Sequence, residues 1–138
     1  MGEKLDKLRE MLGEVTDITH ASSVLGWDQQ TYMPPGGAKD RAMQLATLSS
    51  LAHSKFVSDE MGSTLDAASQ EIEGADADSD QVRLINKTRH DYEKQIRVPT
   101  AWVAEFSRTG ALARAGLQAS DPGRARRIRK SDHLRRRP

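Results

Sequence analysis

Residues 3–37 read EKLDKLREMLGEVTDITHASSVLGWDQQTYMPPGG, and this stretch decides the fold. Its apolar residues recur at steps of three and four, which places their side chains on one face of an α-helix. Such a helix should end before Pro34, because proline lacks the N–H donor and disfavours helical geometry in the preceding residue. The apolar stripe consists of Leu5, Leu8, Leu12, Val15 and Thr19, widened by Met11, Ile18 and Leu25.

Helical periodicity resumes after the Pro-Pro-Gly-Gly turn and continues to about residue 107, with no alternating pattern long enough for a strand. The sequence therefore predicts an all-α protein. Ser, Thr and Asp side chains at the boundaries are suited to cap the first turns of these helices. The expected helices are Ala38 to about Lys55, one capped by Ser58 or Asp59, one capped by Ser79 or Asp80 and ending before Pro99, and one capped by Thr100.

Composition separates the chain into two parts. The 138 residues carry a net charge of +1, but residues 1–107 hold 11 basic and 18 acidic side chains, whereas residues 108–138 hold 10 and 2. All six aromatic residues lie before Ser107. The sequence therefore predicts a helical region at 1–107 and an irregular, Arg-rich tail at 108–138. With no cysteine in the chain, a disulfide framework and a Cys-ligated metal are excluded.

The residues offer no recognisable active site. The four histidines stand at positions 20, 53, 90 and 133, so no two share a helical turn as a His-Glu-x-x-His zinc site requires. No Gly-x-Ser-x-Gly sequence supports a nucleophile at Ser22 or Ser49, and Gly36-Gly37 lacks the spacing of a phosphate loop. We therefore name no catalytic and no metal-binding residue in this chain.

One stretch is too unusual to be generic: VLGWDQQTYMPPGGAKDRAMQL, residues 24–45. Together with Ser23, it resembles the amino-terminal signature of the carboxypeptidase Taq family of metallocarboxypeptidases. The resemblance continues through residues 48–53, 89–92 and 98–99, and so covers most of residues 1 to about 107. The matching signature residues are Ser23, Leu25, Trp27, Asp28, Thr31, Met33, Pro34, Gly36, Arg41, Ala42 and Gln44.

This resemblance implies the N-terminal helical part of a zincin-like metallocarboxypeptidase, whose full-length members release C-terminal residues from peptide substrates. Members of the family carry His-Glu-x-x-His and a downstream glutamate, with zinc or cobalt as the metal. Nothing in this sequence matches those residues, so we expect no cofactor in this chain and no activity from it alone. Two hypotheses about the function of this chain remain: a fragment of a carboxypeptidase, or a small helical interaction module with a polyanion-binding basic tail.

The signature residues themselves have either a structural role or a place in the substrate groove, and we favour the structural one. Trp27 is expected to bury its ring at the Pro-Pro turn, with Asp28 and Gln29 hydrogen-bonded to neighbouring backbone. Arg41 is expected to pair with Asp28 or Asp40, or else to line the groove and meet a peptide carboxylate. The signature residues open to both interpretations are Trp27, Asp28, Thr31, Met33, Pro34, Arg41 and Gln44, and Met33 and Met43 are expected to fill the core.

The basic tail is expected to be disordered, and a shift of reading frame would explain its composition. Its arginines have no aromatic neighbours to stack on bases, so we do not favour a nucleic-acid role. Helices that evolved against a larger body would leave apolar faces uncovered, which predicts either self-association or a molten, marginally stable monomer. The start of the sequence lacks the apolar stretch of a signal peptide, and no run is long enough to span a membrane, so we expect a cytoplasmic location.

Overall fold

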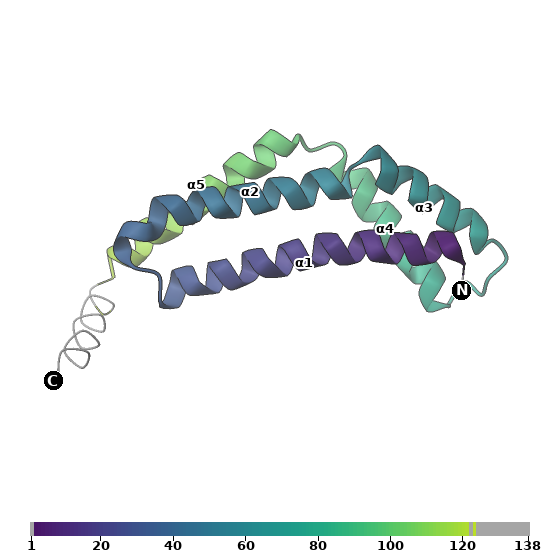
Figure 1. The fold of residues 1–138 in the computed structure, drawn as a ribbon, viewed down its shortest axis with the longest axis horizontal. Helices are drawn as coiled ribbons and strands as arrows, with labels where there is room; N and C mark the ends of the chain where they lie inside the picture. Colours follow the sequence, from purple (N-terminus) through teal and green to yellow (C-terminus); the bar gives the residue numbers. More distant parts are fainter. Residues whose placement is uncertain (1, 122, 124–138) are drawn as a thin grey trace.

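The computed structural model describes residues 2–121 and 123, and within them all regular structure is helical. Helix α1 (Glu3–Thr31) and helix α2 (Ala38–Phe56) run antiparallel along the length of the molecule, joined by the short 3-10 helix η1 (Pro35–Gly37) (Figure 1). With 29 residues, α1 is about 44 Å long, at 1.5 Å per residue. The all-α prediction and the helix end before Pro34 are both confirmed.

Helices α3 (Asp59–Glu71) and α4 (Asp80–Gln95) gather at the N-terminal end of α1 and form the larger core with it. The side chains of Leu5 and Leu8 are fully buried there, whereas Thr19, which was expected on the same stripe, is exposed. The apolar face of α1 therefore meets a complete core only in its first turns. The buried members of this core are Leu5, Leu8, Phe56, Met61, Leu65, Ala68 and Ile85.

The boundaries of α3 and α4 follow from serine caps. Ser58 Oγ accepts a hydrogen bond from Met61 N at 3.1 Å, and Ser79 Oγ accepts one from Val82 N at 3.4 Å. Each side chain satisfies one of the backbone donors that a helix leaves free in its first turn. Of the alternatives open at these two boundaries, the serine is therefore the cap in both cases.

The residue before helix α1, Gly2, has no side chain to cap the helix, and Glu71 of α3 caps it instead. The Glu71 carboxylate accepts hydrogen bonds from Leu5 N at 2.9 Å and Lys4 N at 3.3 Å. A negative charge at this position also interacts favourably with the positive end of the helix dipole. A Cβ on Gly2 would collide with this carboxylate, so glycine leaves room for the cap.

Helix α5 (Thr100–Ala119) packs along α2, and its start differs from expectation. Pro99 is the residue before the first helical turn and has no side chain able to cap, and Thr100 is already helical, so the prediction of a Thr100 cap is wrong. The Thr100 hydroxyl instead lies 2.9 Å from Nδ1 of the buried His53. His53 Nε2 lies 3.2 Å from the carbonyl oxygen of Gln95, so one imidazole joins α2 to the ends of both α4 and α5.

The helix also continues past Ser107, where the composition changes. Ala111 is buried against Ala42 and Leu45 of α2, and alanine and leucine are strong helix formers, so the chain stays helical to Ala119. The prediction of an irregular tail from residue 108 is therefore wrong for residues 108–119, which are helical. Residues 124–138, the most basic part of that tail, lie outside the described residues.

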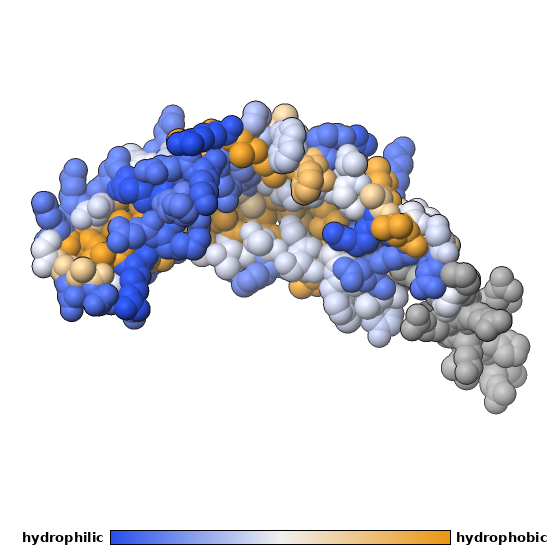
Figure 2. All heavy atoms as spheres, turned by 180° about the vertical axis from the view of Figure 1, so that it is seen from behind, coloured by the Kyte–Doolittle hydropathy of each residue, from blue (hydrophilic) through white to orange (hydrophobic). Residues whose placement is uncertain are grey.

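The surface reflects this uneven core. Figure 2 shows apolar surface lying open in a hollow along the middle of the rear face, while hydrophilic residues predominate at the end where α3 and α4 meet α1. Met43, expected in the core, is 54% exposed because the buried side of α2 is formed by Ala42, Leu45 and Ala46. None of the helices within the described residues combines the length and apolar character needed to cross a membrane.

We predict that Gly62→Ala lowers the free energy of unfolding by about 1–3 kcal/mol, because the added methyl group overpacks the α3–α4 contact. A Cβ at Gly62 would lie 2.6 Å from the Tyr92 hydroxyl oxygen, and that ring packs edge-on against Phe56. Gly13→Ala is the matched control, since nothing lies within 4 Å of its added Cβ. It should stabilise the chain by up to about 1 kcal/mol through helix propensity alone. Urea denaturation followed by circular dichroism measures both, and equal effects would contradict the contact.

Candidate functional site

The signature residues surround the corner where α1 gives way to α2. The backbone N–H groups of Tyr32 and Met33 both donate to the carbonyl oxygen of Asp28, at 3.0 and 2.9 Å, and so close the last turn of α1. Pro34 then takes an extended conformation (φ −64°, ψ 149°), which stops the helix. Its carbonyl oxygen accepts a hydrogen bond from Gly37 N at 2.9 Å, and the chain enters α2 directly afterwards.

Arg41 is the residue that ties this corner together. Its Nη2 lies 2.8 Å from Asp28 Oδ2, its Nη1 donates to the carbonyl oxygen of Leu25 at 2.6 Å, and its Nε donates to Gln44 Oε1 at 3.0 Å. The Arg41 side chain is 14% exposed and that of Asp28 is 34% exposed. The planar guanidinium thus satisfies an ion pair and two hydrogen bonds at once, in a partly buried site. Of the two carboxylates expected as its partner, Asp28 is the one paired with it.

Gln29 makes a second connection from α1, which the sequence did not reveal. Its side chain is fully buried, and Nε2 donates to the carbonyl oxygen of Ala111 in α5 at 2.9 Å. The prediction placed its hydrogen bond on neighbouring backbone, whereas the acceptor is 82 residues away in sequence. The available signal was its position four residues after Leu25, on the same face of the helix.

Trp27 does not bury its ring, so that prediction is wrong. The side chain is 59% exposed and contacts only Tyr32 among the aromatic residues, with ring centroids 5.7 Å apart. The physical reason is its place on the helix: α2 packs against the side of α1 that carries Leu25 and Asp28. Thr31 is exposed too, and its hydroxyl donates to the carbonyl oxygen of Trp27 at 2.9 Å.

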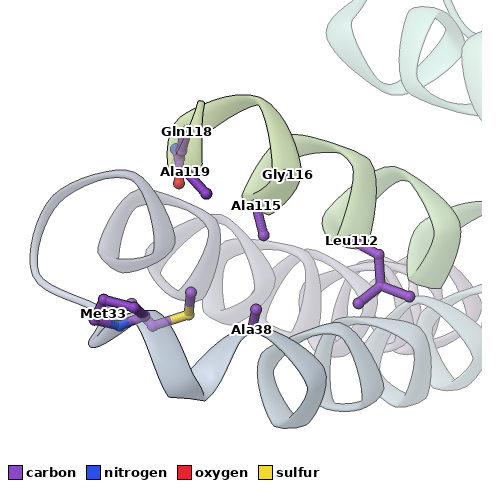
Figure 3. Close-up of a pocket in the computed structure, with 8 residues that line it drawn as sticks. Met33, Ala38, Leu112, Ala115, Gly116, Gln118 and Ala119 are labelled. Atoms are coloured by element: carbon purple, nitrogen blue, oxygen red, sulfur yellow. The ribbon is translucent and has the colours of Figure 1, made fainter. Parts of the chain in front are cut away.

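Met33 is buried, as expected, and it forms one wall of a pocket of about 360 Å³. The pocket lies between the corner and the last turns of α5, where Ala38, Leu112 and Ala115 surround the same space (Figure 3). Gln118 is the most polar of the residues around it. This pocket can therefore hold an apolar group, and none of the described residues that line it has an ionisable side chain that would act as an acid or base.

The ionisable groups of the described residues form surface ion pairs rather than a metal site. Within residues 2–121 and 123, no group of three or more His, Cys, Asp or Glu side chains could hold a metal ion. Hydrogen bonds from Lys7, Lys87 and Arg108 hold the pKa values of Glu60, Asp91 and Glu105, respectively, below their usual ranges. Lowered carboxylate pKa values with a cationic partner are typical of surface ion pairs, whereas a catalytic acid needs a raised one.

The structure therefore brings together Asp28, Arg41 and Gln44, and it buries Met33 beside them. Trp27 and Thr31 face outward from the same corner. We then compared the sequence with known protein families. The family model of the carboxypeptidase Taq (M32) metallopeptidases matches residues 7–119. The chain belongs to this family. The match extends past Ser107 and ends at the last residue of α5.

Two curated relatives show how much of the M32 fold this chain represents. It is 25% identical to thermostable carboxypeptidase 1 of Thermus thermophilus over 119 residues, which are 83% of this chain and 22% of that protein. It is 24% identical to carboxypeptidase 1 of Bacillus subtilis over 97 residues, which are 70% of this chain and 19% of that protein. The chain thus spans about a fifth of the length of these relatives. No solved structure matches it significantly.

We predict that Arg41→Ala lowers the free energy of unfolding by about 2 kcal/mol, because it leaves the Asp28 carboxylate and the Leu25 carbonyl without their cation. Arg41→Lys should recover only part of this loss, since an ammonium group cannot reproduce the planar fork. Arg108→Ala is the control: its ion pair with Glu105 is 41% and 59% exposed, so solvent screens it and its loss should cost far less than that of Arg41. Chemical denaturation of the three variants tests this, and equal losses for Arg41 and Arg108 would refute it.

Proposed function

We propose that this chain is the N-terminal helical portion of a metal-dependent carboxypeptidase and hydrolyses no peptide by itself. The observation that carries the proposal is the match over residues 7–119 to the M32 family model, in a chain that spans 22% of the Thermus enzyme. The portion matched holds no His-Glu-x-x-His sequence. In an M32 enzyme its part is then to shape the peptide-binding side of the molecule.

The catalytic metal, zinc or cobalt, has no place among the described residues of this chain. A catalytic zinc site needs three protein ligands and an open position for water, and no such group of side chains exists here. We therefore assign the metal and the residues that activate water to the other part of the enzyme. Peptide is the substrate class, and release of its C-terminal residue is the reaction.

What this chain contributes is a rigid hairpin. The partly buried Arg41–Asp28 pair and the Pro34 stop set the direction in which α2 leaves α1. Met33 and the apolar pocket beside it lie at the tip of this hairpin, together with the outward-facing Trp27 and Tyr32. This tip is suited to form a wall of a peptide groove, because it combines apolar surface with a fixed backbone.

The alternative is a helical interaction module with no link to peptide hydrolysis. Exposed aromatic side chains favour some contact surface, but they are equally expected of a family member that covers only a fifth of its relatives. The polyanion-binding tail of this alternative lies mostly in residues 124–138, outside the described residues. We therefore keep the carboxypeptidase portion as the proposal.

The test is a chimera in which residues 1–121 of this chain replace the matched N-terminal portion of the Thermus thermophilus enzyme. We expect the chimera to release C-terminal residues from peptides in the presence of zinc or cobalt, and a chelator to abolish the activity. The 138-residue chain alone should show no turnover and no stoichiometric metal.

A chimera that fails to fold or hydrolyse peptide would contradict the proposal, because interchangeable N-terminal portions are what it requires. Chelator-sensitive hydrolysis by the 138-residue chain alone would contradict it in the opposite way, by showing that a metal site assembles within this chain.

A further inference from the structure

A groove of about 640 Å³ runs between α1 and α5, with Leu45 and Ser49 of α2 at its floor. Both outer helices pack on α2 but touch each other little, so the space between them stays open. The lining positions recur every three or four residues, from Thr19 to Gln30 on α1 and from Val103 to Arg114 on α5. Each wall is thus one continuous helix face about 16 Å long, which is three turns.

A glycine lies in the middle of each wall, and no contact among the described residues explains why either position needs glycine. Gly26 of α1 and Gly110 of α5 line the groove, and a Cβ added to either would have nothing within 4 Å. Neither residue has a positive φ. A glycine in a helix interior costs about 0.5–1 kcal/mol relative to alanine. Its usual benefit is close approach of another backbone, and within residues 2–121 and 123 no other backbone approaches these two glycines.

The rims of the groove are aromatic and largely uncharged. Trp27 is 59% exposed and Phe106 is 67% exposed, and the Phe106 ring stacks on Trp102 with centroids 5.3 Å apart. Among the described residues that line the groove, Arg114 is the single charged one, although charged residues form 30% of the whole chain. Aromatic side chains beside a groove with few charges are typical of an interface core, where aromatic residues are enriched and charged residues depleted.

We propose that this groove receives an α-helix from the part of the M32 carboxypeptidase that lies beyond the portion matched here, an inference that rests on the proposed function. Two observations select this occupant. The relatives contain about four times as much further chain as the matched portion, which is ample to supply a covering helix. The groove has the length of three helical turns, and a helix with small and apolar residues on one face would complete a four-helix arrangement with α1, α2 and α5.

The test places leucine at the two groove glycines in the Thermus chimera described above. We expect Gly26→Leu and Gly110→Leu each to lower the melting temperature of the chimera and to reduce its peptidase activity at least tenfold, because the added side chains fill the seat of the helix. Gly13→Leu is the matched control. Its position is also a helix-interior glycine of α1 with nothing within 4 Å, but it lies roughly 140° around the helix from Gly26.

The same three variants are made in the 138-residue chain alone to separate this effect from misfolding. There we expect all three to keep the helical circular dichroism signal and a melting temperature no lower than that of the parent, since leucine is a better helix former than glycine. A loss of stability in the isolated Gly26→Leu or Gly110→Leu chain would show that the groove is closed within this chain, and would overturn the proposal.

The remaining outcomes distinguish the two proposals and the competing occupant. An active parent chimera that tolerates both groove leucines would overturn the groove proposal and leave the proposed function intact. An inactive parent chimera would contradict the proposed function, and the groove proposal would fall with it. The 138-residue chain is also examined by sedimentation equilibrium. If it forms a dimer that the groove leucines abolish, while the chimera tolerates them, a second copy of the chain is the occupant and the proposal is overturned.

Discussion

The contact on which the rest of the structure depends is the guanidinium of Arg41 between Asp28 and the carbonyl oxygen of Leu25. It joins the last turns of α1 to the first turn of α2 across a corner whose backbone is already restricted by Pro34 and Pro35. A hydrophobic contact at this point would allow α2 to slide or rotate, whereas a charged fork with three fixed acceptors does not. The direction of the hairpin is therefore set by electrostatics and hydrogen bonding more than by apolar burial.

Beyond the corner, α2 positions helix α5. Helix α5 packs along it through the buried Ala42–Ala111 contact and a 3.0 Å hydrogen bond between Ser49 and Ser107. Gln29 then reaches from α1 to the backbone of Ala111. These are small or polar side chains, which permit close approach but bury little apolar area. The three-helix part of the molecule consequently has a fixed geometry and a thin core.

Features that depend on neighbouring residues could be predicted from the sequence. Features that depend on packing against a residue far away in the sequence were predicted wrongly. The stripe of Leu5 and Leu8, the serine caps and the stop at Pro34 each follow from a few neighbouring residues, so they could be predicted. The ring of Trp27 is expected to be buried because it lies next to the Pro-Pro turn that it would fasten, but α2 covers the other side of α1. Helix α5 was expected to end near Ser107 because the charge changes there, whereas packing of Ala111 on α2 carries it onward.

The two ends of the molecule differ in the size of their buried apolar clusters. At the α3–α4 end, seven buried apolar side chains form one cluster, and Glu71 caps the first turn of α1. At the α5 end, the cluster is Ala42, Leu45 and Ala111, with Leu25 partly buried against it. The α5 end thus depends on close packing of α5 along α2 with few large apolar side chains, whereas the α3–α4 end depends on a larger apolar cluster. The smaller core therefore adjoins the exposed rings of Trp102 and Phe106, which lie on α5 itself.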